Sequence, residues 1–547
     1  MAHTFSLAGH LVDVHSRTER SVTVHVDDGV IDRIVPTDDV PDRYLMPGFV
    51  DAHVHVESSM LTPSEFARAA VPHGTVGTVS DPHEIANVLG VDGVEYMIED
   101  GRQVPFHFAF GAPSCVPATP FETSGATLGP DAVAALLDRD DVPYLSEMMN
   151  VPGAINRDDD VMAKIEAAVT RGKPVDGHAP GLRGEGVEQY ASAGIETDHE
   201  CFEIEEAREK LAAGMKIAIR EGSAAKNFDE LIPLMDEAPE RLMFCSDDKH
   251  PDSLVDGHID ALVRRALDRG YDRYDVLHAA CVHPVEHYDL EIGLLREGDS
   301  ADFIVVDDPD APHVQRTYVE GDLVAEDGDP LIPRTSSAVV NRFEAGPVEA
   351  RDFVVEADGD QVRAITAVDN QLMTGETVVQ MPIEDGQAVA DPARDLLKLA
   401  VVNRYADADP AVAFIQGFGL EAGALASSVA HDSHNVVAVG TSDAALARAV
   451  NAVVAEEGGI SAVHGDTQHV LPLPVAGLIS DRPYDEVARR YTRLSRFVQD
   501  ELGSPMDAPF MTLSFMALLV IPQLKLSDQG LFDGEAFAFV DRFVEER

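Results

Sequence analysis

The sequence predicts an α/β protein: a TIM-like (β/α)8 barrel, a small discontinuous β-sandwich domain and a C-terminal α+β domain. Three observations lead to this fold class. Short apolar strands alternate with amphipathic helices through residues 47–288, β-like segments flank that stretch on both sides, and a region of mixed strands and helices follows. The length of 547 residues agrees with several domains, because a single core rarely grows past about 250–300 residues.

Residues 1–46 are expected to begin the small β domain. Their apolar and polar residues alternate as in short strands, and Gly and Asp-Gly turns separate the runs. The same pattern returns after the barrel, in residues 289–335. We infer that the two segments complete one domain, which the barrel interrupts in sequence.

Residues 47–288 are expected to form the barrel. Eight strand candidates follow one another, and predicted helices such as 131–137, 161–170 and 258–267 fall between or after them. Eight strand–helix repeats match the count of a (β/α)8 barrel. The candidate strands span residues 48–51, 75–79, 107–110, 143–145, 174–176, 194–197, 216–219 and 242–245.

Residues 340–547 are expected to form the C-terminal α+β domain, in which strands and helices are mixed. An Ala-rich helix is predicted over 443–456. A longer helix is predicted over 484–502, because Pro483 is a helix start signal and the periodicity continues for several turns.

Histidines and acids follow five of the eight predicted strands. Barrel active sites lie at the carboxyl ends of the strands, so these side chains are expected to converge. Imidazole and carboxylate ligands suit Zn, Mn or Fe rather than Ca or Mg. The candidate metal ligands are His53, His55, Glu147, His178, His199 and Asp247.

The number and spacing of these ligands predict two cations. One open catalytic site typically uses three protein ligands and a water, whereas two cations that share a carboxylate can use six. His53 and His55 point the same way in an extended segment and can hold one cation. Each residue alone could be a core histidine or a surface acid. Four histidines at three strand ends favour the metal site.

The composition limits the partners and the compartment. Lys and Arg total 41 against 97 Asp and Glu, a formal net charge of −56, so we expect neither nucleic acid nor a membrane as partner. Only eight residues are lysines, which indicates a halophilic protein suited to a salt-rich interior. Four widely spaced cysteines, with no predicted signal peptide or membrane span, favour a cytoplasmic protein.

The segments around these residues resemble the adenine deaminases of the amidohydrolase superfamily, essentially from end to end. HxH after the first strand, an acid or modified lysine after the fourth, His after the fifth and sixth and Asp after the eighth form the superfamily pattern. Glu147 stands where many members carry a carboxylated lysine, and it resembles the glutamate variant of the adenine deaminases. The similar segments include PGFVDAHVHVESSMLTP (47–63), SDPHEIANVLG (80–90), SEMMNVPGAI (146–155), DGHAPGL (176–182), AGIETDHE (193–200), IREGSAAKN (219–227), FCSDDKHP (244–251), HDSHNVVAVG (431–440) and TLSFMALLVIPQLKLSD (512–528).

The resemblance implies hydrolytic deamination of adenine to hypoxanthine and ammonia, a step of purine metabolism, by a hydroxide that bridges two divalent cations. Mn(II) or Fe(II) is favoured over Zn(II). The implied ligands are the six candidates above. Asp247 is also implied as general base and then acid, and His199 as a group that stabilises the tetrahedral intermediate. Glu84, Glu221 and His434 are candidate substrate contacts.

Alternatives remain open at this point. Glu84 and Glu221 would protonate the purine ring or form structural salt bridges. His431 and His434 would cap the site, bind a further metal or belong to a loop with Asx-type turns. The rival functions are another hydrolase of the superfamily, acting on a cyclic amide or a different aminopurine, and a metal-free scaffold. The expected partners are adenine and a second copy of the chain, in a homo-oligomer, a dimer.

Overall fold

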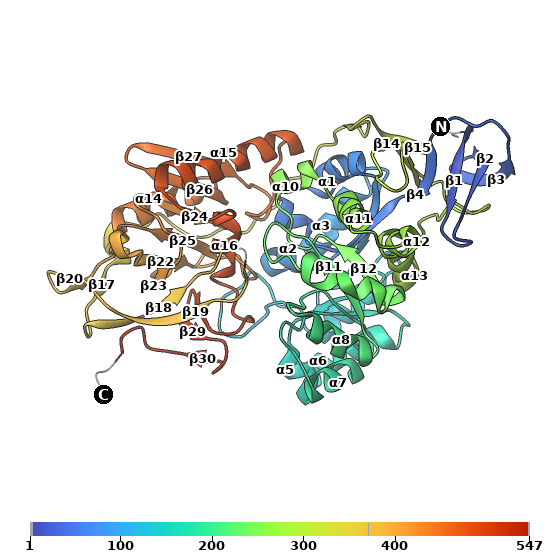
Figure 1. Ribbon diagram of the computed structural model, residues 1–547. Coiled ribbons are helices and arrows are strands. Elements are labelled where there is room, and N and C mark those ends of the chain that lie inside the picture. The colour runs from blue at the N-terminus through green and yellow to red at the C-terminus, as the bar shows by residue number, and fades with distance from the viewer. Residues whose placement is uncertain (1–3, 370, 545–547) are drawn as a thin grey trace.

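The computed structural model describes residues 4–369 and 371–544 and has three parts (Figure 1). A β-sheet that holds the N-terminus lies at one end, the barrel lies in the middle, and the C-terminal region, coloured yellow to red, lies at the other end. One continuous cluster of buried hydrophobic residues runs through the barrel and the C-terminal region. The two are therefore packed together, and Ser480 N–H donates across the contact to the Met60 carbonyl at 2.9 Å.

Eight strands form the barrel in sequence order, as the sequence predicts. The sheet closes between its first and last strands, where Asp247 N–H donates to the His53 carbonyl at 2.9 Å. The strands are β5 (Phe49–Val54), β6 (Thr75–Ser80), β7 (His107–Phe110), β8 (Leu145–Met148), β9 (Val175–Gly177), β10 (Thr197–Asp198), β11 (Lys216–Arg220) and β12 (Leu242–Cys245).

Two barrel strands begin two or more residues later than the sequence predicts. Pro143 has no N–H to offer a neighbour, and the paired part of β8 starts at Leu145. Gly194 belongs to the turn that ends the preceding helix, with a φ of 111° that favours glycine, so β10 starts at Thr197.

Helices cover the outside of the barrel. Most have one apolar face that packs on the strands and one polar face in water. They are α1 (Pro63–Ala70), α2 (His83–Leu89), α3 (Val91–Gly101), α4 (Pro130–Leu137), α5 (Val151–Asn156), α6 (Asp159–Val169), α7 (Glu185–Ser192), α8 (Ile204–Ala212), α9 (Phe228–Leu231), α10 (Pro251–Asp256), α11 (Ile259–Asp268), α12 (Arg273–Leu277) and α13 (His283–Tyr288).

The N-terminal segment and the segment after the barrel share one eight-stranded sheet. The sheet folds over on itself, because the rings of Phe5 and Tyr318 are stacked at 5.3 Å although their strands are three apart. In a flat sheet three strand spacings would separate them by about 14 Å. The strand order is β16 (Asp329–Pro330), β15 (Asp322–Glu326), β14 (Val314–Val319), β13 (Phe303–Val306), β4 (Tyr44–Pro47), β1 (Phe5–Asp13), β2 (Thr18–Asp27) and β3 (Val30–Pro36). The three domain boundaries remain a prediction.

The C-terminal region is built on a second eight-stranded sheet that is buried on both faces. Along β22, Leu397 and Leu399 belong to the cluster shared with the barrel, whereas Ala400 and Val402 pack with α14. The strand order is β19 (Gly375–Gln380), β18 (Gln361–Thr366), β23 (Ala411–Gln416), β22 (Leu397–Val402), β25 (Val436–Gly440), β24 (Ala424–Ser427), β26 (Gly459–His464) and β27 (Thr467–Pro472).

Three helices and two small sheets complete the C-terminal region. The long predicted helix is present with its predicted ends. The helices are α14 (Asp443–Ala455), α15 (Tyr484–Leu502) and α16 (Pro509–Phe515). One small sheet has β17 (Val355–Glu356), β21 (Gln387–Ala388) and β20 (Ile383–Glu384), and the other has β28 (Leu524–Ser527), β29 (Gly530–Asp533) and β30 (Ala538–Phe539). Across the described part of the chain, no helix combines the length and the apolar character that a bilayer crossing requires.

Candidate metal centre

The six predicted ligands lie together at the mouth of the barrel. Their exposed fractions are between 2% and 7%, so all are buried. They fall into overlapping groups whose ligand atoms lie within 4.8 Å of one another. The groups are His53, His55 and Asp247; His53, Glu147 and His199; and His178, His199 and Glu200.

Glu147 lies between two sets of imidazoles. Its Oε2 is 3.0 Å from His178 Nδ1 and 3.1 Å from His199 Nε2. Its Oε1 is 3.6 Å from His55 Nε2. Imidazoles therefore lie against both oxygens of this carboxylate.

The HxH pair and Asp247 supply a second set of donor atoms. Asp247 Oδ1 is 3.0 Å from His55 Nε2 and 3.5 Å from His53 Nε2. The two Nε2 atoms are only 3.2 Å apart. Two imidazole nitrogens so close repel each other unless a proton or a cation lies between them. This donor set fits a divalent cation that accepts nitrogen and oxygen ligands.

Backbone hydrogen bonds hold these ligands in place. Asp247 N–H donates to the His53 carbonyl at 2.9 Å, and His55 N–H donates to the Asp247 carbonyl at 3.4 Å. The first and last strand ends are therefore joined where their ligands project. On the other side of the mouth, His178 N–H donates to the Tyr190 hydroxyl at 3.0 Å.

A buried arginine that the sequence analysis did not single out lies beside the centre. The Arg220 guanidinium contacts both Glu200 and Asp247. Burial raises the pKa of Asp247, but the charge of Arg220 and hydrogen bonds from His53 and His55 outweigh burial and hold that pKa well below its usual value. Asp247 is therefore ionised, as a metal ligand must be.

Two further side chains at the end of β6 were missed from the sequence. Asp81 and His83 form another group of ligand atoms with His55 and Glu147. His83 Nδ1 is 3.2 Å from Asp81 Oδ2 and 3.6 Å from Glu147 Oε1. The signal was present, because an acid and a histidine two residues apart follow a predicted strand inside one of the family-like segments.

The three predicted substrate contacts lie in two different places. Glu84 and His434 touch each other where the barrel meets the C-terminal region, and His431 Nδ1 is 2.5 Å from Glu84 Oε1. Glu221 instead pairs with Arg265 at 2.8 Å. The salt-bridge alternative describes Glu221 in this structure, and a contact between Glu221 and substrate stays a prediction.

A cavity of about 520 Å³ lies between barrel loops and the C-terminal region. His178 lines it, together with Met149 and Pro180 from the barrel and Val520 and Phe537 from the C-terminal region. Most of these side chains are apolar, which suits the flat faces of an aromatic ring.

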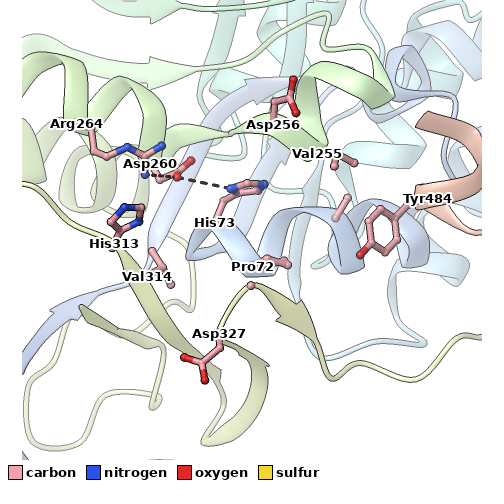
Figure 2. A pocket seen from close by; sticks show the side chains of 12 residues that line it. Pro72, His73, Val255, Asp256, Asp260, Arg264, His313, Val314, Asp327 and Tyr484 are labelled. Atoms are coloured by element: carbon pink, nitrogen blue, oxygen red, sulfur yellow. Dashed lines mark hydrogen bonds and ion pairs between the residues drawn. The ribbon is translucent and has the colours of Figure 1, made fainter. Parts of the chain in front are cut away.

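A second cavity lies on the outside of the barrel (Figure 2). It measures about 580 Å³, and none of the residues that line it is a predicted ligand. In it, His73 Nδ1 and Arg264 Nη1 lie 3.6 Å and 2.5 Å from Asp260 Oδ2. Three of its polar residues therefore pair with one another.

Comparisons with known proteins were made for the whole chain. The amidohydrolase family matches residues 44–324, and the adenine deaminase C-terminal domain matches residues 371–538. The chain is 76% identical over 546 residues to the adenine deaminase of Salinibacter ruber (strain DSM 13855 / M31), covering 100% of both chains. The chain belongs to the adenine deaminase family. Membership of this family confirms the resemblance found in the sequence and the TIM-like fold class.

Other relatives extend the comparison. The adenine deaminase of Sulfurovum sp. (strain NBC37-1) is 55% identical over 535 residues, covering 98% of this chain and 99% of the relative. Among solved structures, an N-acetyl-D-glucosamine-6-phosphate deacetylase from Mycobacterium smegmatis covers 59% of this chain and 100% of its own, at 15% identity and a TM-score of 0.46.

Proposed function

We propose that the protein catalyses the hydrolytic deamination of adenine to hypoxanthine and ammonia. The observation that carries this proposal is the convergence of four histidines and two acids at the barrel mouth of a chain from the adenine deaminase family. Water adds its oxygen to C6 of the purine, N1 gains a proton, and the bond from C6 to the amino nitrogen breaks. The active protein is thus a hydrolase of a cyclic amidine.

Two divalent cations are proposed at the centre, with Mn(II) or Fe(II) favoured over Zn(II). The ligands are the six predicted side chains, with Glu147 between the two cations. The clustered imidazole and carboxylate atoms of the centre fit such cations. When bound, divalent cations supply Lewis acidity and lower the pKa of water, from 15.7 to about 7 in the best-known zinc case.

The proposed catalytic residues act on protons and charge. Asp247 takes the proton that water loses and passes it to the departing amine, as general base and then acid. His199 donates toward the oxygen that becomes negative as C6 becomes tetrahedral. Glu84 and His434 are proposed substrate-side residues, because they lie together at the edge of the centre.

The assay that tests this function follows the loss of adenine absorbance and the appearance of hypoxanthine with metal-loaded protein. Asp247→Asn should lower kcat by about 10²- to 10⁴-fold, the usual contribution of a proton-transfer group. Elemental analysis should find two cations per chain, and fewer in His53→Ala. Turnover of another aminopurine or a cyclic amide, with none of adenine, would replace this proposal.

The remaining proposals concern the setting of the enzyme. We propose that the protein is salt-adapted, on the basis of the charge of −56 and the eight lysines, that it is cytoplasmic, on the basis of its four widely spaced cysteines, and that it forms a dimer. Activity should fall when the protein is desalted and return in concentrated KCl. Full activity in dilute buffer would contradict the salt adaptation, and sedimentation of the native protein tests the dimer.

A further inference from the structure

A carboxylate of the C-terminal region faces the metal centre across one imidazole. Asp432 lies in the loop 431–435 between β24 and β25, and its Oδ1 is 3.7 Å from His83 Nε2. The other ring nitrogen of His83 lies 3.6 Å from Glu147 Oε1. The width of a single ring therefore separates Asp432 from the carboxylate that we place between the cations.

Both side chains are buried and keep unused hydrogen-bonding capacity. Asp432 is 3% exposed and His83 is 2% exposed. Within residues 4–369 and 371–544, Asp432 Oδ2 and both ring nitrogens of His83 have no hydrogen-bond partner. Buried polar groups in native proteins are nearly always paired, so these atoms indicate a place for a ligand that pairs them.

Contacts with the barrel fix the loop that carries Asp432. Ser433 Oγ donates to Glu122 Oε2 at 2.9 Å, and Asn435 Nδ2 donates to the Thr123 carbonyl at 2.8 Å. These bonds flank Asp432 on its C-terminal side and hold the loop against the barrel mouth. Asp432 is therefore held at the contact between the C-terminal region and the barrel mouth.

The other acid at this place is already engaged. Glu84 has His431 against one oxygen and His434 against the other. These contacts join the barrel to both ends of the loop. Both Glu84 oxygens therefore face imidazoles of the loop itself, whereas Asp432 Oδ2 has no hydrogen-bond partner among the described residues.

The chemistry of free adenine matches a carboxylate at this position. Neutral adenine carries one ring N–H, on its five-membered ring, and an ionised carboxylate can only accept hydrogen bonds. We propose that Asp432 accepts a hydrogen bond from this ring N–H and thereby selects the free base over its nucleoside. This inference rests on the proposed function.

The same contact explains how a nucleoside would be rejected. A nucleoside has its sugar on the ring nitrogen, so it lacks the N–H and brings a bulky group against a buried loop. Sites built to hydrogen-bond a substrate N–H discriminate strongly against analogues that lack it, because the buried acceptor is then left unpaired. Asp432 is therefore a specificity-determining residue.

Adenine and 9-methyladenine are the probes for this contact, since the methyl group removes the ring N–H. The KM for adenine and the inhibition constant of 9-methyladenine against adenine turnover are measured for the unaltered enzyme, Asp432→Asn and Asp432→Ala. The KM should rise by about 10- to 100-fold, more in the alanine variant, while kcat changes less. The inhibition constant should stay nearly unchanged.

Asp528→Asn is the matched control. Asp528 is another acid of the C-terminal region at the same contact, where it accepts from Thr123 N–H at 2.9 Å and from Asn403 Nδ2 at 2.8 Å. A loosened contact between the two parts would change both constants together. A selective rise in the KM of the Asp432 variants, absent from Asp528→Asn, would support the proposal.

Three results would overturn it. Equal losses for adenine and 9-methyladenine in the Asp432 variants would show that no ring N–H is recognised. Loss of one cation from Asp432→Asn would instead indicate a further metal site, because His83, Glu84 and Asp432 lie close enough to share a cation. Failure of the unaltered, metal-loaded enzyme to deaminate adenine would refute the proposed function itself, before any variant is compared.

Discussion

Two groups of buried acids in the same barrel differ in how their oxygens are satisfied. In the interior, Asp51 accepts a hydrogen bond from His258 Nε2 at 2.8 Å, and Asp176 accepts one from the Tyr288 hydroxyl at 2.8 Å. At the mouth, Glu147 and Asp247 face imidazoles that crowd one another as well as the acids. Both groups are equally buried.

The difference separates acids that support the fold from acids that bind a ligand. An acid whose oxygens accept hydrogen bonds from N–H or O–H groups is satisfied without a ligand. Such an acid helps to specify one packing of the barrel interior. At the mouth, several imidazoles are crowded together around the same acids, and such a buried group is costly until a cation enters it. Burial therefore does not distinguish the two groups of acids in this protein, whereas the crowding of imidazoles around the mouth acids does.

The largest expected effect is at the mouth. Glu147→Gln keeps the shape of the side chain but removes the charge that two cations would share. Activity should fall by more than about 10⁴-fold, beyond the cost of losing one proton-transfer group. Elemental analysis should find fewer than two cations per chain. If Glu147→Gln kept two cations per chain and near-normal turnover, the mouth acids would not differ in function from the interior acids.

A smaller effect is expected in the interior. Tyr288→Phe removes the donor that pairs with Asp176 and should lower the free energy of unfolding by about 1–3 kcal/mol. Because the tyrosine contacts no predicted ligand, metal content and kcat should persist. Denaturant unfolding, together with the adenine assay, measures both. If Tyr288→Phe lost metal without losing stability, the interior acids would belong to the metal centre as well.

The effect that is smallest at pH 5, and that grows with pH, concerns Glu122, an acid that is hydrogen-bonded yet sensitive to pH. Thr119 Oγ1 and Ser433 Oγ donate to its two oxygens. Burial, with the charge of Asp432, raises the pKa of Glu122 to about 8. The folded protein then keeps a proton that the unfolded chain releases above its ordinary pKa, so the stability from this group is full at low pH and is lost as the pH rises toward 8.

Glu122→Gln keeps the neutral form at every pH. The free energy of unfolding of this variant, relative to that of the unaltered protein, should therefore increase as the pH rises from 5 to 8, by up to about 1.4 kcal/mol per pH unit. Denaturant titrations at several pH values measure this slope. The matched variant at an exposed position, Glu456→Gln, should show no such trend. An unchanged slope in Glu122→Gln would mean that this acid is ionised in the fold.

Much of the site could be predicted because barrel strands are short and direct their last residues to one place. His53, His55 and Asp247 are recognisable from the strand that precedes each one. Closure of the sheet then brings the ends of the first and last strands together. The ends of α15 are likewise local, since periodicity and a preceding proline define them.

Other features depend on contacts that no short pattern encodes. His83 and Asp432 are 349 positions apart in sequence and meet only because the C-terminal sheet packs over the barrel mouth. From the sequence alone, local periodicity determined the strand count, while the motifs at the strand ends indicated the family and six candidate ligands. Only the tertiary structure decided that Glu221 pairs with Arg265 and that Asp432 lies beside His83, because such pairings depend on how separate elements pack.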